Sequence, residues 1–159
     1  MTVRPATEAD AGAVAAIWNH YIRHSTVTFA SVEKSVAEVA ALIAMRPAFF
    51  VAESPSGIVG FATYDQFRGG DGYARTMEHT VQLHPDCKRG GHGRALMTAI
   101  EDHARARGAH SIFAGVSAEN DTGRAFHARC GYGETAILPQ AGWKFGRWID
   151  LVLMQKILS

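Results

Sequence analysis

The chain has 159 residues, of which 47% are hydrophobic, and its formal net charge is +1. This length and composition suit one domain over residues 1–159 with a core of its own. The nearly balanced charge argues against a nucleic-acid partner, and no apolar run is long enough to cross a membrane. The N-terminus lacks a signal-peptide core, and Cys87 and Cys130 make no disulfide framework, so we expect a cytoplasmic protein.

The first part of the chain predicts a short strand over residues 3–5 and then two helices. Thr7 and Asp10 form a capping-box pattern, and the residues after them place an apolar stripe on one helix face. This stripe consists of Val14, Ile17, Trp18, Tyr21 and Ile22. A second capping box, Ser35–Glu38, starts a helix that ends at Arg46, because the residue before a proline avoids helical geometry.

His20 and His24 stand four residues apart on the first predicted helix, a spacing that two metal ligands can use. The glutamate of the His-Glu-x-x-His pattern is missing, however, and no third ligand is evident. We therefore interpret both histidines as surface or packing residues and predict no metal site.

The middle of the chain predicts a hairpin, a third strand and a helix. Residues 49–53 and 58–65 have the pattern of strands, and the turn Ser54–Gly57 joins them. A β-compatible run follows at residues 73–83. After a loop, an apolar stripe predicts a helix over residues 94–107.

The last part of the chain predicts a strand, a helix and two final strands. The strands cover residues 110–116, 132–137 and 147–154, and residues 139–145 form a connection between the last two. The helix begins at Asn120 or Thr122 and ends at Gly131. The resulting order, β-α-α-β-β-β-α-β-α-β-β, indicates a mixed sheet with helices on both faces.

The loop over residues 84–93 joins the predicted strand at 73–83 to the start of the next helix. Glycines let a backbone approach a bulky anion, and the free N–H groups and the dipole at a helix start favour negative charge. The glycines are Gly90, Gly91 and Gly93, and the basic residues beside them are Lys88, Arg89 and Arg94. A phosphate or pyrophosphate is therefore the expected ligand, and the alternative is a glycine-rich turn that binds none.

Two common phosphate-binding patterns do not match this loop. The P-loop requires Gly-Lys-Ser/Thr at the helix start, where this chain has Gly-Arg-Ala, and the dinucleotide pattern requires a third glycine, where it has Leu96. What remains is Lys88-x-x-Gly91-x-Gly93. This resembles the acyl-CoA loop of the GNAT N-acetyltransferases, Gln/Arg-x-x-Gly-x-Gly/Ala, and Lys88 keeps a positive charge where that family usually has Arg or Gln.

A second motif and the order of the elements extend the resemblance over nearly the whole chain. The run Asn120…Ala125-Phe126…Gly131-Tyr132 resembles the second GNAT signature. Three further segments resemble the phosphinothricin and methionine-sulfoximine N-acetyltransferases within that family. These segments are Glu78–Val81, His127 and Lys144–Trp148.

The resemblance implies an α/β fold with a GNAT-like mixed, mostly antiparallel sheet, in which one parallel strand pair splays apart. Acetyl-CoA would bind in the opening between residues 73–83 and 110–116, with its pantetheine beside Val81 and Leu83. Its pyrophosphate would lie on the glycine loop, and Asn120 would hold the thioester region. The loop residues implied for this role are Lys88, Arg89, Gly90, Gly91, His92, Gly93 and Arg94.

The implied reaction is the attack of an amine on a thioester. An amine is mostly ammonium near neutral pH, so it must lose a proton before it attacks. Glu78 is the candidate base, directly or through a water; the alternative is a surface carboxylate or an ion-pair partner of Arg75. His127 is either the proton donor to the leaving thiolate or a helix residue that contacts CoA.

The implied substrate is a small amino-acid-like amine. A free amino acid needs a partner for its carboxylate, and Arg75 could make a bidentate contact with it. Thr76 and Met77 would line the pocket. Phe29 would either form a wall of that pocket or serve as a core aromatic.

The leading hypothesis is therefore an N-acetyltransferase that moves the acetyl group of acetyl-CoA to phosphinothricin, methionine sulfoximine or methionine sulfone. One alternative is the same chemistry on a peptide N-terminus, a polyamine or an antibiotic. Another is a non-catalytic acyl-CoA-binding module, against which the presence of both Glu78 and His127 argues. The resemblance also implies a homodimer, with Lys144 and Arg147 reaching a pocket across its interface.

Overall fold

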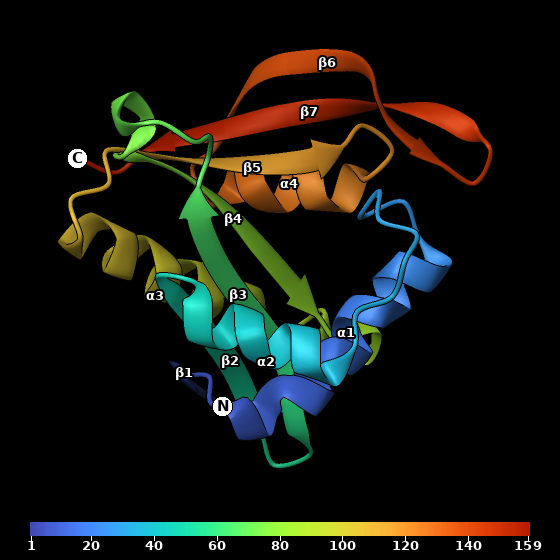
Figure 1. Cartoon of the computed structure of the whole chain (residues 1–159), viewed down its shortest axis with the longest axis vertical. Helices are drawn as coiled ribbons and strands as arrows, with labels where there is room; N and C mark the ends of the chain where they lie inside the picture. Colours follow the sequence, from blue (N-terminus) through green and yellow to red (C-terminus); the bar gives the residue numbers. More distant parts are fainter.

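All 159 residues, Met1–Ser159, are described by the computed structural model of the chain, which is built on a seven-stranded sheet (Figure 1). The strands are β1 (Thr2–Pro5), β2 (Ala48–Ser54), β3 (Gly57–Gln66), β4 (Thr76–Leu83), β5 (Ser111–Ser117), β6 (Gly133–Lys144) and β7 (Arg147–Ile157). Their order in the sheet is β1-β2-β3-β4-β5-β7-β6. Only β4 and β5 pair in parallel, which confirms the expected mixed, mostly antiparallel sheet.

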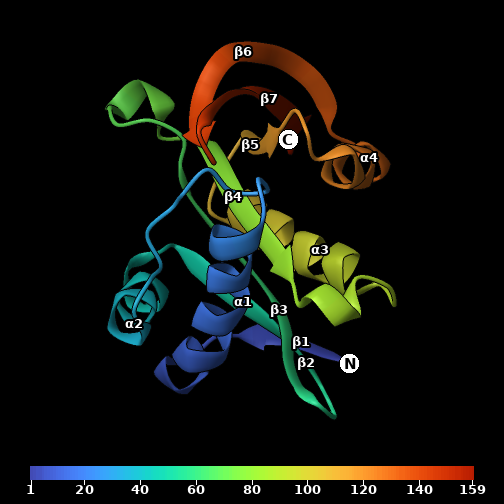
Figure 2. The ribbon, with the colours of Figure 1, turned by 90° about the vertical axis from the view of Figure 1, so that its right-hand side faces the viewer.

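Four α-helices cover the two faces of the sheet (Figure 2). They are α1 (Ala11–His24), α2 (Val36–Met45), α3 (His92–Ala106) and α4 (Asp121–Arg129). Short 3-10 turns lie at η1 (Glu8–Asp10), η2 (Asp71–Tyr73) and η3 (Pro85–Cys87). Helices α1 and α2 lie on one face, and α3 and α4 lie on the other, as expected. None of the helices combines the length and the apolar character that a membrane span requires.

The alternation of side chains along the strands gives each face of the sheet its own core. Phe61 on β3 packs in the core under α1 and α2, whereas its neighbour Ala62 packs in the core under α3. Trp18 of α1 reaches the first core, with its ring centroid 4.8 Å from that of Phe61. Leu96 and Ile100 of α3 belong to the second core. The central strands are therefore fixed between two helix layers.

The helix starts follow the capping chemistry of the sequence. Ser35 Oγ and Asn120 Oδ1 accept hydrogen bonds from backbone amides in the first turns of α2 and α4. The carboxylate of Asp10 accepts a hydrogen bond from the Thr7 amide, although this capping box opens the turn η1 and not α1 itself. Helix α3 begins after Gly91, whose φ of 81° lies in the left-handed region that favours glycine.

The parallel strands β4 and β5 are paired over only the first half of β4. Pairing runs from Thr76, which faces Ser111, to His79, which faces Ala114. Beyond His79, β4 stays paired with β3 while β5 stays paired with β7, so the two strands separate (Figure 1). One backbone edge of residues 80–83 therefore has no strand partner. Apart from the Leu83 carbonyl, which accepts a hydrogen bond from the Tyr21 hydroxyl, its polar groups are available to a ligand.

The strand predicted over residues 73–83 begins only at Thr76, so its first boundary is wrong. Residues 71–73 form the turn η2 instead. The side chain of Gln66, at the end of β3, donates hydrogen bonds to the carbonyls of Arg68 and Gly70 and holds this connection. With β3 ended at Gln66, the residues before Thr76 have no β3 residue to pair with.

The connection expected over residues 139–145 is also wrong, because β6 continues to Lys144. Pro139 and Gly142 are ordinary loop signals, but they lie in and beside a bulge. The pairing with β7 shifts between Leu138 and Gly142, which leaves Pro139 outside the ladder. The hairpin then turns at Phe145–Gly146, where φ is 51° and 76°.

Candidate functional site

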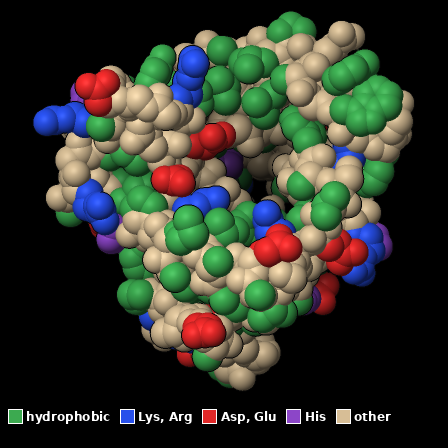
Figure 3. Space-filling view, in the orientation of Figure 1, with side chains coloured by type: hydrophobic (Ala, Val, Ile, Leu, Met, Phe, Trp, Pro, Cys, Tyr) green, Lys and Arg blue, Asp and Glu red, His purple; other side chains and the backbone are tan.

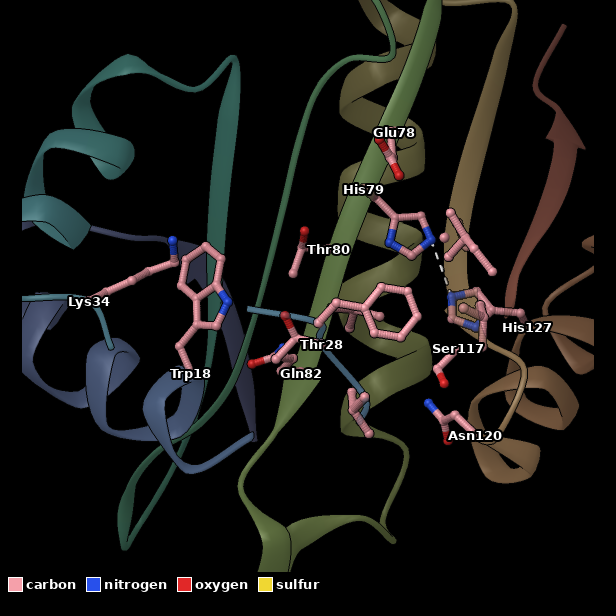
Figure 4. A pocket seen from close by; sticks show the side chains of 17 residues that line it. Trp18, Thr28, Lys34, Glu78, His79, Thr80, Gln82, Ser117, Asn120 and His127 are labelled. Atoms are coloured by element: carbon pink, nitrogen blue, oxygen red, sulfur yellow. Dashed lines mark hydrogen bonds between the residues drawn. The ribbon is translucent and has the colours of Figure 1, made fainter. Parts of the chain in front are cut away.

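A cavity of about 320 Å³ opens where β4 and β5 separate (Figure 4). Its lining comes from both strands, from β7, from α4 with the residue that caps it, and from the segment between α1 and α2. We call residues 25–34 of that segment the strap. The molecular surface is hollowed in the middle of the face seen in Figure 3, and acidic and basic side chains stand near this hollow.

Glu78 is the only Asp or Glu that lines the cavity. A Cβ atom added at Gly115 of β5 would lie 3.0 Å from Glu78 Oε2, so the missing side chain leaves room for this carboxylate. Burial raises the pKa of Glu78 above its ordinary value, while the charge of Arg46 acts in the opposite direction. A carboxylate with a raised pKa is a better proton acceptor, which suits the removal of a proton from an ammonium group.

His127 of α4 forms a buried pair with His79 of β4, and the ring centroids lie 5.1 Å apart. His127 Nδ1 lies 2.8 Å from the carbonyl oxygen of Gly123 and must donate to it, because a carbonyl only accepts. In the neutral ring, Nε2 is then an acceptor, so His79 Nε2 donates to it across 3.2 Å. Burial lowers the pKa of both imidazoles, more strongly for His79, which keeps the pair neutral near pH 7.

This hydrogen-bond pattern bears on the two roles open to His127. The neutral ring carries no proton on Nε2, the atom that faces His79, because Nδ1 carries it toward Gly123. The geometry therefore favours the role of a contact residue over that of a proton donor. His79 is a residue that the sequence analysis did not assign, and its buried Nδ1 has no hydrogen-bond partner.

Two further cavities, of about 180 and 210 Å³, continue from the first toward the glycine loop. The residues shared by the first and second are Val27, Val81, Gln82, Asn120 and His127. Those shared by the second and third are Leu83, Lys88, Gly93, Phe126 and Arg129. Together the cavities form one trail that leads from Glu78 to the N-terminus of α3. A long ligand with a reactive group at one end and an anionic group at the other suits this shape.

Gln82 lies at the junction of the first two cavities, and its side-chain oxygen is buried without a hydrogen-bond partner. A buried acceptor left unpaired costs free energy, so a ligand N–H group is the donor that this position lacks. The amide groups of a pantetheine chain supply such donors. Sequence reasoning missed Gln82 because a single glutamine in a strand carries no motif.

The start of α3 has the properties of an anion site. The first backbone bond of the helix runs from the Ala95 amide to the Gly91 carbonyl, which leaves the amides of residues 92–94 free. Lys88 and Arg94 line the third cavity. A Cβ atom at Gly93 would lie 3.0 Å from the ring of Phe126, so glycine is needed there for α3 to pack against α4.

The remaining loop residues lie farther out. Arg89 and Gly90 are exposed, His92 is half-buried, and none of the three lines the trail of cavities. Their predicted contact with CoA stays a prediction. Asn120 lines the first two cavities while its oxygen caps α4, so only its amide nitrogen is left for a ligand.

The strap is held over the cavity by the hairpin of β6 and β7. Lys144 is 1% exposed, and its Nζ donates to the carbonyls of Ser25 at 2.6 Å and Thr28 at 2.8 Å, and to a third carbonyl at the end of α1 at 3.4 Å. Phe29 lines the cavity and packs on Gly142, where a Cβ atom would lie 2.4 Å from its ring. These contacts place Phe29 in the wall of the cavity.

The predicted reach of Lys144 and Arg147 across a dimer interface does not match their positions. Lys144 is buried against the strap of its own chain. Arg147 forms an ion pair with Glu119 at 2.6 Å, and Glu119 also accepts a hydrogen bond from Thr26 in the strap. Both basic side chains are therefore occupied within the chain, where they help to hold the strap.

The residues predicted to bind substrate are only partly brought together. Phe29 lines the cavity, but Arg75, Thr76 and Met77 do not. Arg75 is exposed just before β4, and Met77 packs against the core under α3. Trp18 and Lys34 line the cavity instead. Lys34 stands in a polar loop and belongs to no motif, so sequence reasoning could not single it out.

Three comparisons place this geometry among known proteins. Residues 14–132 match the Acetyltransferase (GNAT) family. The chain is 34% identical to the L-amino acid N-acyltransferase MnaT of Escherichia coli, with 98% of this chain and 92% of that protein covered. It is 34% identical to an L-methionine sulfoximine/L-methionine sulfone acetyltransferase of Salmonella typhimurium, covering 98% and 93%. It is 33% identical to the phosphinothricin N-acetyltransferase of Alcaligenes faecalis, covering 99% and 83%.

The fold agrees with a solved relative. The structure of yncA from Salmonella typhimurium, determined with its cofactor acetyl-CoA, matches with a TM-score of 0.95 and 34% identity over 100% of this chain and 94% of that one. The trail of cavities, the unpaired edge of β4 and the free amides of α3 suit the same ligand. The chain belongs to the GNAT family and is an acetyl-CoA-dependent N-acetyltransferase of the group that contains the MnaT and phosphinothricin enzymes.

Proposed function

We propose that this enzyme acetylates the amino group of a small amino-acid-like substrate of the phosphinothricin, methionine sulfoximine or methionine sulfone type. The observation that carries the proposal is the cavity beside Glu78, which is closed by the strap and holds about 320 Å³. Such a volume suits a substrate of the size of a free amino acid. Glu78 is its only carboxylate, whereas a polyamine or an aminoglycoside would need several.

The three relatives compared by sequence above support the same class of substrate. Their names refer to L-amino acids, to methionine sulfoximine and methionine sulfone, and to phosphinothricin. All of these molecules carry an α-amino group beside a carboxylate. The identity of 33–34% supports the class, and we leave the choice within it to experiment.

Acetyl-CoA supplies the activated acetyl thioester, and the residues of this chain prepare the amine. Glu78 accepts a proton from the substrate ammonium, directly or through a water, and so frees the nitrogen lone pair. A C–N bond then forms and the C–S bond breaks; the nitrogen loses its remaining extra proton, which balances the charge of the CoA thiolate that leaves. Backbone N–H groups on the unpaired edge of residues 80–83 stabilise the negative charge that develops on the carbonyl oxygen.

Different parts of the trail of cavities bind different parts of acetyl-CoA. The free amides at the start of α3, with Lys88 and Arg94, bind the pyrophosphate. Gln82 and the edge of β4 at Val81 and Leu83 meet the pantetheine, and Asn120 lies near the thioester end. No step of this reaction requires a metal ion.

We also propose that the whole chain acts as one catalytic domain in the cytoplasm and forms a homodimer. Both cysteines are free, which suits a reducing compartment. The hairpin of β6 and β7 exposes Trp143 by 53%, Phe145 by 55% and Trp148 by 57%. Large aromatic side chains that stand together on a surface mark an interaction site. Light scattering on the purified protein tests the dimer.

The function is tested by measuring free-thiol release from acetyl-CoA with a panel of amines. The panel contains phosphinothricin, methionine sulfoximine, methionine sulfone, spermidine, an aminoglycoside and a short peptide. Turnover restricted to the three amino-acid analogues is the expected result. Turnover restricted to the cationic amines would contradict the proposed substrate class but keep the enzyme class.

A further inference from the structure

Lys34 stands at the end of the strap and is the only Lys or Arg among the 17 residues that line the cavity. Its ammonium lies 4.7 Å from the centre of the Trp18 ring, over the face of the indole (Figure 4). The cavity therefore contains one basic side chain, Lys34, and one carboxylate, Glu78. The two lie on different walls, Lys34 on the strap and Glu78 on β4.

The position of Lys34 is fixed by its backbone. The side-chain amide of Asn19 on α1 donates to the Lys34 carbonyl and accepts from the Lys34 amide, both at 2.8 Å. The next residue, Ser35, caps α2. Because the backbone of Lys34 is already fixed between two helices, ligand binding does not have to order it further. The Trp18 face guides that side chain by a cation–π contact.

The charge of Lys34 is not used inside the chain. Its Nζ makes no ion pair and no hydrogen bond with any residue of the protein. The neighbouring carboxylate of Glu33 is instead paired with Arg23 at 2.5 Å. An ammonium group that lines a cavity and lacks a partner there is available to an anionic ligand group.

We propose that Lys34 binds the anionic group of the substrate while Glu78 receives the proton of its amino group. This proposal rests on the proposed function and deepens it, because it assigns the recognition of a carboxylate, phosphinate or similar group to the strap. It replaces Arg75, which lies outside the cavity. The cavity thereby selects a zwitterion. An amine without an anionic group leaves Lys34 unpaired, and a molecule without a free amino group gives Glu78 no proton to accept.

The test compares two substitutions at Lys34 with a matched control. Lys34→Met removes the charge and keeps the length of the side chain, and Lys34→Arg keeps the charge. Arg107→Met removes an equal charge from an exposed residue that does not line the cavity. KM and kcat are measured for the best amino acid of the panel and for its carboxamide, which has the same shape without the negative charge.

Lys34→Met is expected to raise the KM for the amino acid about 10-fold or more, which corresponds to a loss of at least about 1.4 kcal/mol of binding free energy. The KM for the carboxamide and for acetyl-CoA should stay within about 2-fold of the unmodified enzyme. Lys34→Arg should retain most of the affinity for the amino acid, and Arg107→Met should have no effect.

Two results would overturn the inference and a third would overturn the function beneath it. An equal rise in KM for the amino acid and the carboxamide would show that Lys34 shapes the cavity but does not recognise the negative charge of the substrate. An unchanged KM for the amino acid in Lys34→Met would remove Lys34 from recognition. Failure of the unmodified enzyme to acetylate any free amino acid, with turnover of other amines, would contradict the proposed function itself.

Discussion

Replacing Lys144 by methionine is the most direct test of how the strap is held. Its ammonium makes two short hydrogen bonds, at 2.6 Å to Ser25 and 2.8 Å to Thr28. Each such bond to a charged group contributes about 1.5–3 kcal/mol. Burial opposes this gain, because it disfavours the charged form and lowers the pKa of Lys144. Methionine fills the same space but leaves the carbonyls without their donor.

We therefore expect Lys144→Met to lower the free energy of unfolding by about 2 kcal/mol, since part of the loss is offset by the desolvation that no longer occurs. For a chain of this length that corresponds to a fall in Tm of about 4–8 °C. The loosened strap no longer fixes Phe29 in the wall, so the KM for the amine should rise about 10-fold. The KM for acetyl-CoA should change less, because most of its trail is lined by β4, α4 and the start of α3 and not by the strap.

The measurements are thermal unfolding by circular dichroism and steady-state kinetics with both substrates. Lys156→Met is the control, because Lys156 also holds a carboxylate and a carbonyl, at 2.7 Å to Glu101 and 2.9 Å to Cys130, but it does not touch the strap. The control should lose stability and keep its KM for the amine. An unchanged amine KM in Lys144→Met, or equal effects of the two variants on it, would refute the reasoning.

Three further predictions concern the site itself. Glu78→Gln should lower kcat by about 10²–10⁴-fold and remove the acid limb of the kcat/KM–pH profile. In the unmodified enzyme this limb should lie above pH 4.5, because burial raises the pKa of Glu78. An unaltered rate would exclude Glu78 as the base. The buried pair of His79 and His127 should cost stability as the pH falls below about 6.5, because the unfolded imidazoles then bind protons that the folded ones resist. Replacing both with Phe should flatten the pH dependence of Tm between pH 7 and about 5, and a slope that persists would assign it to other groups. Gly115→Ala would place a Cβ 3.0 Å from Glu78 Oε2, so kcat should fall about 10-fold or more with no change in acetyl-CoA binding; full activity would show that the carboxylate tolerates the shift.

Much of the fold could be predicted because its signals are local. The capping patterns at Ser35 and Asn120 depend on residues within one turn of the helix, and the hydrogen bonds they predict are present. The glycine loop before α3 is likewise a property of consecutive residues. The boundaries that failed, at Thr76 and in β6, depend on whether a partner strand is alongside. No stretch of sequence contains that information by itself.

The residues of the site divide in the same way, into those that local sequence predicts and those that depend on distant contacts. Glu78, the loop glycines and Asn120 belong to short motifs, so they could be named in advance, whereas Lys34 belongs to none. Lys144 lies in a segment that resembles the family, but its contact with the strap was not predicted. Lys144 is 110 or more residues away from the carbonyls that it binds, in the strap and at the end of α1.

The sequence by itself determined the order of the elements, the anion loop and the acid placed beside the splayed strands, because each depends on side chains a few positions apart. Only the tertiary structure decided which cation enters the cavity, why β6 continues past a proline and which tautomers the His79–His127 pair adopts. Those features arise from desolvation and from contacts between distant segments. Their energies exist only once the sheet, the strap and the hairpin have come together.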